Sequence, residues 1–274
     1  MNRRHFLLAA LACACAAPVW AAPNLDDLKA AGGLRVAVYR DFPPYSWQEA
    51  GEMRGIDADL ARAIGRELGL KVTFMPLTPA DDVDGDLRNA IWKGHYLGGG
   101  TAELMLRVPF DPEFAQRNHN AVLFGAYASE QLAWAGQRPT AMTLIDRASR
   151  IGVENDSLAD LYLSALQGGR LRDSIKHYPN SPAAARALLA GDVDAVFAPQ
   201  GELDWALAGH GQRIEPLAAP GLIKSQWEIG MATKESLRDL AWAVTDVIEA
   251  LRQSGELERI YQRHQVRFLP PAAH

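Results

Sequence analysis

Four side chains suited to holding a small molecule lie within seven residues, directly after the apolar stretch 34–38. They are Tyr39, Asp41, Phe42 and Tyr45. Aromatic rings present flat faces to planar, apolar or cationic groups, and a carboxylate accepts hydrogen bonds and pairs with cations. The loop contains no glycines of the kind that approach a phosphate. We therefore predict a site for a small molecule other than a nucleotide.

The elements around this loop form one βαβ unit. Residues 34–38 and 71–75 are expected strands, because both are apolar runs bounded by breaks. Between them, apolar residues at helical spacing predict a helix that ends at Gly69. In such units the loops at the carboxyl ends of parallel strands contact ligands. The aromatic loop is one of these.

Residues 34–74 resemble the opening of bacterial periplasmic solute-binding proteins of the polar amino-acid type, extracellular solute-binding protein family 3. In that family a helix reads G-[FI]-D-x-D-L-A-x-A-[IL], and here residues 55–64 read GIDADLARAI. The chain's ending, residues 236–264, is similar to the family's two closing helices. Members of the family are receptors of ABC transporters.

The resemblance implies an α/β fold, the two-lobe periplasmic binding protein type II fold, with a discontinuous first lobe and two hinge crossings. We expect lobe 1 from residues 34–130 plus 227–265, lobe 2 from 132–225, and a C-terminal tail from 266–274 that is frayed over residues 270–274. We also expect Ser181 to cap a helix over 181–190. Such a protein closes on a ligand held between its lobes and delivers it to a permease.

The first 22 residues read as a cleaved export signal. Basic residues precede an apolar stretch over 6–17, and Val19-Trp20-Ala21 forms a small-residue cleavage site. Arg3-Arg4 fits the twin-arginine pattern, but a Sec signal fits equally. The chain's only two cysteines lie inside this segment. We expect a periplasmic protein without a membrane anchor.

Composition excludes some partners. A net charge of −5 argues against nucleic acid as a partner. The acids at 81, 82, 84 and 86 lack the spacing of a calcium loop, and the histidines lack the spacing of a zinc site. We expect no metal and no cofactor.

Ligand chemistry depends on residues that differ from the family pattern. The resemblance implies an arginine for the ligand's carboxylate, for which Arg117 is the nearest match and Arg107 the second. The family's ammonium-binding acid is replaced by Ala198-Pro199. We therefore expect the cleft to refuse standard α-amino acids and to take an anionic or neutral ligand. Five further candidates for contact with the ligand are His95 and Tyr96, before a glycine run, and Glu154, Asp156 and Ser157, before a helix of the second lobe.

Two alternatives stay open beside transport. Residues 105–109 resemble a subgroup encoded beside quinoprotein alcohol dehydrogenases, which implies an accessory protein with a periplasmic dehydrogenase as partner. A cyclohexadienyl-dehydratase-like enzyme shares the same architecture and would need Glu154, Glu202 or Asp41 as its acid or base. The main expectation is a binding protein that is not an enzyme.

Overall fold

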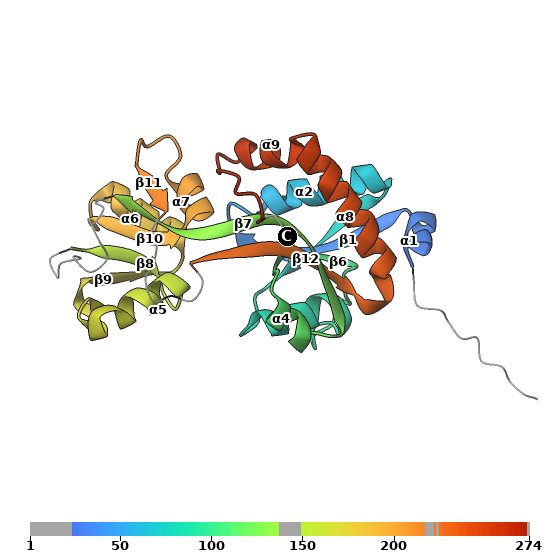
Figure 1. Ribbon diagram of the computed structural model, residues 1–274, viewed down its shortest axis with the longest axis horizontal. Coiled ribbons are helices and arrows are strands. Elements are labelled where there is room, and N and C mark those ends of the chain that lie inside the picture. Colours follow the sequence, from blue (N-terminus) through green and yellow to red (C-terminus); the bar gives the residue numbers. More distant parts are fainter. Residues whose placement is uncertain (1–23, 137–148, 217–221, 223–224, 273–274) are drawn as a thin grey trace, which may run out of the picture.

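The computed structural model describes residues 24–136, 149–216, 222 and 225–272 (Figure 1). Two lobes are joined by two long strands, β7 (Ala121–Gly136) and β12 (Gln226–Lys234). The chain leaves the first lobe along β7 and returns to it along β12. The predicted α/β fold, with two lobes, a discontinuous first lobe and two crossings, is therefore confirmed. The predicted export signal and its cleavage site lie outside the described residues.

The first lobe consists of two groups of strands and the helices that pack around them. Its strands are β1 (Gly33–Tyr39), β5 (Lys71–Leu77), β6 (Leu104–Pro109) and a small sheet of β2 (Asp41–Phe42), β3 (Ser46–Glu49) and β4 (Glu52–Arg54). Its helices are α1 (Leu25–Ala31), α2 (Ile56–Leu68), α3 (Val83–Leu87), α4 (Pro112–Arg117), α8 (Arg238–Gln253) and α9 (Glu256–Arg263), with a π-helical turn at Arg88–Trp92. A short 3₁₀ turn lies at Glu235–Leu237 in this lobe, and two others lie at Leu166–Gly169 and Arg172–Ser174 in the second lobe.

The second lobe repeats the alternation of strand and helix. Its elements are β8 (Ile151–Glu154), α5 (Leu158–Ala165), β9 (Ile175–Tyr178), α6 (Ser181–Ala190), β10 (Ala195–Pro199), α7 (Gln200–Ala206) and β11 (Ile214–Pro216). The strand order through both lobes is β5-β1-β6-β12-β7-β10-β8-β9, with β11 also on β7. Residues 121–131 of β7 pair with β12, and residues 132–136 pair with β10. One strand therefore serves both lobes.

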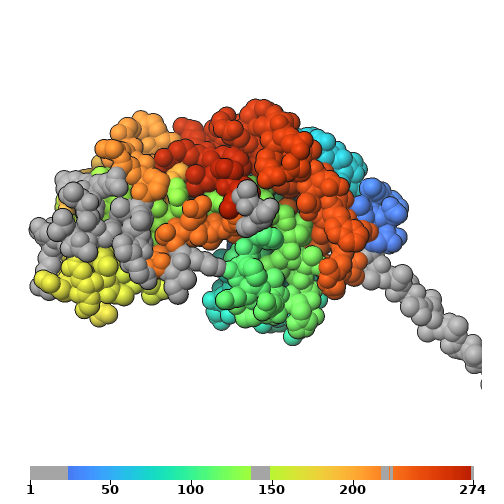
Figure 2. Space-filling model, in the orientation of Figure 1, coloured from blue at the N-terminus to red at the C-terminus, as the bar shows by residue number. Residues whose placement is uncertain are grey.

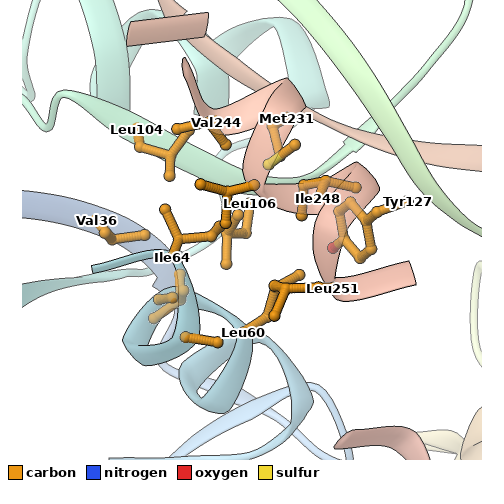
Figure 3. Close-up of a cluster of buried hydrophobic side chains, with 14 of the residues drawn as sticks. Val36, Leu60, Ile64, Leu104, Leu106, Tyr127, Met231, Val244, Ile248 and Leu251 are labelled. Carbon is orange, nitrogen blue, oxygen red and sulfur yellow. The ribbon is translucent and has the colours of Figure 1, made fainter. Parts of the chain in front are cut away.

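The core of the first lobe explains why the aromatic loop is held firmly. Leu60 and Ile64 of α2 pack against Leu104 and Leu106 of β6 and against α8 (Figure 3). Their spacing of four residues places both on one face of the helix. Full burial of one such side chain contributes roughly 1.5–3 kcal/mol. This packing fixes the ends of β1 and β6, from which the cleft is built.

Helix ends follow local chemistry. Gly69 adopts a left-handed conformation with φ of 70° and ends α2, as predicted. The prediction for α6 is wrong in one detail: Asn180, not Ser181, is the N-cap, and its side chain accepts a hydrogen bond from the Ala183 amide. Ser181 instead donates to a carboxylate of the cleft.

The C-terminal tail packs on the molecule over residues 266–272, and the prediction of fraying is wrong for residues 270–272, where the Ala272 amide donates to Glu228. Val266 is buried, and the Phe268 ring packs on Tyr261 with ring centroids 5.1 Å apart. Arg267 pairs with Asp204 of α7 in the other lobe, and its Nη2 lies 2.7 Å from the carboxylate Oδ1. The segment then runs along β7, where the Ser129 amide donates to the Leu269 carbonyl at 2.8 Å. Side chains that find partners on both lobes thus hold this segment in place.

Candidate ligand-binding cleft

A cavity of about 440 Å³ lies between the two lobes. In Figure 2 the lobes are separated by a notch at the lower edge of the view. The first lobe contributes Tyr39, Asp41, Phe42, Pro79, Val83, Asp86, Arg107 and Pro109; the crossing strands contribute Glu130, Trp227 and Ile229; and the second lobe contributes Glu154, Pro199 and Glu202. Rotation of one lobe on the other would enclose a molecule held there.

Aromatic side chains form one wall of the cleft. The rings of Tyr39 and Phe42 pack edge to face, with centroids 5.8 Å apart and planes at 89°. The Tyr39 hydroxyl donates a hydrogen bond of 2.8 Å to Asp86. Burial, together with the Asp86 charge, raises the pKa of Tyr39 far above its ordinary value. Tyr39 is therefore a neutral donor that fixes this wall.

Arg107 is a buried cation at the back of the cleft. Its Nε lies 2.9 Å from Oδ2 of Asp57, and its Nη1 lies 3.3 Å from Oε1 of Glu130. The guanidinium carbon lies 3.2 Å from the centroid of the Tyr45 ring, and the Tyr45 hydroxyl donates to Glu130. Nη1 and Nη2 are buried and have no hydrogen-bond partner within the described chain. A ligand reaches them only if neighbouring side chains move.

The backbone at Arg107 explains how the side chain reaches this position. Its φ is +59°, in the left-handed region that non-glycine residues seldom adopt. The register between β6 and β12 shifts here, because Met105 to Val108 spans three steps opposite the two steps from Gly230 to Ala232. This is a β-bulge, a device that redirects a side chain at the cost of local strain.

Acidic side chains dominate the cleft. Five of its residues are carboxylic acids: Asp41, Asp86, Glu130, Glu154 and Glu202. Within the described lining Arg107 is the one basic residue, and it is already paired. Burial raises the pKa of Asp86, and burial together with the charges of Glu130 and Glu154 raises the pKa of Glu202 to about 8. This charge pattern argues against an anionic ligand, one of the two kinds expected from the sequence.

The carboxylates come from different elements that the topology brings together. Glu130 lies on β7, where the strand passes from one lobe to the other. Glu154 ends β8, and its Oε2 accepts hydrogen bonds from the Ser181 amide at 3.1 Å and hydroxyl at 2.9 Å. Glu202 lies in the first turn of α7 and is only 4% exposed. The acid that the family pattern places at 198–199 is absent, but Glu154 and Glu202 bring carboxylates of the second lobe to the cleft.

Several residues predicted from the sequence lie at the cleft. Tyr39, Asp41, Phe42, Arg107 and Glu154 line it. Tyr45 lies behind this lining, fully buried against Arg107. Their roles in binding stay proposals, but the structure places all six in one region.

Five other predicted residues lie elsewhere. Tyr96 is 88% exposed, and its ring centroid lies 4.4 Å from that of His95. Arg117 is more than half exposed and lies 3.6 Å from Asp84.

The Ser157 hydroxyl accepts a hydrogen bond from the Asp160 amide and so caps α5. Asp156 is exposed beside it, and its backbone amide donates to the Asp160 carboxylate. The polar groups of this turn therefore serve the helix start and leave the cleft to Glu154.

Sequence reasoning missed three residues that shape the cleft: Asp86, Glu130 and Trp227. It named Glu202 only as a possible acid or base of an enzyme. Asp86 and Glu130 lie in largely buried stretches, and a carboxylate within such a stretch is the signal that could have revealed them. Asp86 is 5% exposed and accepts hydrogen bonds from Tyr39 and the Ala80 amide.

A larger hollow, of about 1000 Å³, does not lie between the lobes. It lies on the first lobe and is lined by Trp47, Arg54, Phe74 and His264 among others. Because all of its residues belong to one lobe and its C-terminal helix, hinge motion would not close it.

Among the described residues no group of three or more His, Cys, Asp and Glu side chains could hold a metal ion. None of the described helices has the length and apolarity that a membrane span requires.

Comparisons with known proteins agree with this architecture. Residues 34–90 match the model of the bacterial extracellular solute-binding proteins, family 3. The chain is 22% identical to the L-cystine-binding protein TcyJ of Escherichia coli (strain K12) over 243 residues, which cover 87% of this chain and 85% of that protein. The resemblance to family 3 is thus supported, whereas the subgroup beside quinoprotein dehydrogenases stays a prediction.

Solved structures share the fold. An ancestral cationic amino acid solute-binding protein, AncCDT-1, matches with a TM-score of 0.69 and 19% identity, covering 88% of this chain and 99% of that chain. A second structure of it is described as a precursor of cyclohexadienyl dehydratase. The amino acid transporter substrate-binding protein AbpA of Streptococcus pneumoniae, bound to L-arginine, matches with a TM-score of 0.58 and 22% identity, covering 87% and 97%. The chain therefore has the two-lobe periplasmic binding protein fold.

Proposed function

We propose that this protein is a periplasmic solute-binding protein that closes on a small organic cation and delivers it to an ABC transporter. The observation that carries the proposal is the cavity of about 440 Å³ between the lobes, lined by five carboxylic acids and by aromatic rings. Its volume suits a molecule of the size of an amino acid. Export to the periplasm, by the Sec or the twin-arginine route, agrees with the signal read in residues 1–22.

The lining supports a cation through two kinds of contact. Carboxylates on both lobes can pair with a positive charge, and those of Glu130 and Glu202 lie where water is largely excluded, which strengthens such pairs. Phe42 and Trp227 offer ring faces, and a cation over an aromatic face gains about 0.5–2 kcal/mol. Two relatives point the same way, since one is described as a cationic amino acid binder and another is bound to L-arginine.

Closure follows from differential contact. A cation bound to the first-lobe acids alone would leave Glu154 and Glu202 unpaired, and rotation of the second lobe would bring those carboxylates to it. Because the ligand makes both sets of contacts only in the closed form, it shifts the population toward that form. A permease would recognise the closed form.

A calorimetric titration tests the proposal. We would titrate the chain from residue 24 with agmatine, L-arginine and putrescine, and separately with L-glutamate and succinate. We expect saturable binding of at least one cation and no binding of the two anions. Binding of succinate or L-glutamate with refusal of all three cations would refute the proposal.

A dehydratase is the second candidate, because a buried carboxylic acid with a pKa of about 8 is the group that a general acid needs near neutral pH. The cleft charge counts against it, since prephenate and arogenate each carry two carboxylates. Incubation of the protein with both compounds decides the matter, because product formation is incompatible with a pure binder. A dehydrogenase as partner stays an expectation that the relatives described above do not support.

A further inference from the structure

Glu202 differs from the other acids of the cleft in its surroundings. It lies in the first turn of α7, is 4% exposed and still borders the cavity. Asp86 accepts hydrogen bonds from Ala80 and Tyr39, Glu154 accepts two from Ser181, and Glu130 lies 3.3 Å from a guanidinium nitrogen. Glu202 forms no ion pair with any basic side chain of the described chain.

The groups that face Glu202 are two acids, one cation and two hydroxyls. They are Glu130 of β7, Glu154 of β8, Arg107 of β6, the Ser181 hydroxyl of α6 and the Tyr45 hydroxyl of the aromatic loop. Arg107 is engaged with Asp57 and Glu130. A buried carboxylate without its own cation is costly, and such a group holds a proton instead.

We propose that Glu202 is the anchor for the ligand's positive charge, and that it holds a proton in the empty cleft and releases that proton when the cation binds. The inference rests on the proposed function, since it names the residue and the proton exchange within the same cleft. The balance is simple: a neutral carboxylic acid and a cation become an ion pair, and one proton passes to the solvent.

Linkage makes this exchange measurable. If the cation displaces a proton, the proton must weaken cation binding by the same factor. The affinity for a cation therefore rises with pH through the neutral range, by up to about tenfold per pH unit, and levels off near pH 8, where the raised pKa of the empty site lies. A cleft whose acids were all ionised before binding would show no such slope.

The test is calorimetric titration of the wild-type protein with agmatine and with L-arginine at pH 7.0, in phosphate and in Tris. The two buffers differ in ionisation enthalpy, so the difference in apparent binding enthalpy counts the protons released. Agmatine keeps both of its charges at this pH and adds no titration of its own. We expect release of close to one proton, and a dissociation constant that falls about tenfold from pH 6 to pH 7.

Two variants assign the proton. Glu202→Gln keeps the volume but does not titrate, and we expect weaker binding with near-zero proton release and no pH slope. The exposed Glu67→Gln on α2 removes a carboxylate outside the cleft, and we expect the release of close to one proton to persist. The wild-type measurement does not depend on the folding of either variant.

Binding of either probe to the wild type without proton release would overturn the inference and leave the proposed function intact. Undiminished release from Glu202→Gln would do the same, because another group would then carry the proton. Refusal of both probes and of putrescine by the wild type would refute the proposed function, and the inference with it.

Discussion

Glu202 is a buried acid whose pKa is raised to about 8 by burial and by the neighbouring Glu130 and Glu154. In the unfolded chain the same group titrates near 4.5. Between these two pH values the folded state binds more protons than the unfolded state, so the free energy of unfolding falls as the pH rises. The slope from this one group reaches about 1.4 kcal/mol per pH unit.

This linkage gives a prediction for stability. Glu202→Gln removes the titration, so we expect the variant to gain stability relative to wild type as the pH rises from 5 to 8. Urea unfolding at pH 5, 6.5 and 8 measures the difference. The exposed Glu67→Gln on α2 is the control, with the same difference at each pH. A wild-type-to-variant difference for Glu202→Gln that is constant across the range would contradict the assignment.

Arg107 and Asp57 form a buried ion pair, with side chains 4% and 1% exposed. Removal of one partner leaves an uncompensated buried charge, which costs about 3–5 kcal/mol. We expect Arg107→Met to lose that much stability in urea unfolding, and the double variant with Asp57→Asn to recover most of it. Arg117→Met removes a half-exposed pair and should cost less than about 1 kcal/mol. Equal losses of unfolding free energy for the two arginine variants would show that burial of the Arg107–Asp57 pair does not increase its contribution to stability.

The pairing of Arg107 also affects whether the cleft can bind a carboxylate group of a ligand. Because Arg107 is paired with Asp57 and Glu130, a carboxylate in the cleft would meet acids without a free cation. We therefore expect agmatine, which lacks the carboxylate of L-arginine, to bind more tightly than L-arginine in the same titration. Tighter binding of L-arginine would mean that the Arg107 side chain moves to meet the carboxylate.

Phe42 tests the aromatic wall. Its ring lines the cleft beside Tyr39 and lies 5.9 Å from the Arg107 guanidinium carbon. Loss of a cation–aromatic contact costs about 0.5–2 kcal/mol, so we expect Phe42→Ala to raise the dissociation constant of agmatine roughly 2- to 30-fold. Phe42→Tyr, which keeps the ring, should bind nearly as wild type. If the alanine variant binds agmatine as wild type does, the cation lies away from this wall.

At the scale of elements, the sequence predicts the regular helices and strands well and the irregular segments poorly. The period of apolar residues and a terminal glycine define α2 because both are local properties. The bulge that directs Arg107 inward depends on the pairing of β6 with β12, residues more than a hundred positions apart. Nothing in the local sequence reports such a pairing.

In the cleft, too, features set by the local sequence could be predicted and features set by distant pairings could not. The aromatic loop was recognised because Tyr39 and Phe42 follow a strand directly. Glu202 lies on the helix that follows the family's anchor position at 198–199, and its approach to the cavity depends on where α7 begins and how that helix packs. His95 and Tyr96 have suitable chemistry, but the direction of a glycine-rich loop does not follow from composition.

The C-terminal segment, residues 266–272, ties the lobes together and supplies a prediction at this scale. Arg267 lies on a segment that follows α9, yet it pairs with the buried Asp204 of α7. A hydrogen bond to a charged group contributes about 1.5–3 kcal/mol, so we expect Arg267→Ala to lower the free energy of unfolding by about that amount. Arg259→Ala removes a surface pair with Glu256 and should cost under about 1 kcal/mol. Equal losses from both variants in urea unfolding would show that the segment is not held through Asp204.

At the scale of the whole molecule, contacts between the lobes gather near the crossing strands. Trp47 and Trp205 pack with ring centroids 5.8 Å apart, and the side chains of Gln131 and Gln200 share a hydrogen bond of 2.8 Å. Gly201 lies so close to the Tyr45 hydroxyl that a side chain there would clash. We expect these contacts to restrict the lobes to rotation about this side, so that the cleft side opens and closes.

The central claim is that a small organic cation binds between the lobes and closes them, and the distance between α4 and α5 tests it most directly. These helices belong to different lobes and both lie in the lower part of the view in Figure 1. A chain that starts at residue 24 has no cysteine, so Gln116→Cys and Leu161→Cys, both at exposed positions, accept spin labels selectively. Double electron–electron resonance then measures the distribution of distances between the two spin labels. We predict that saturating agmatine shifts this distribution to shorter distances and that succinate leaves it unchanged; an unchanged distribution with agmatine bound, or a shift with succinate, would contradict the account.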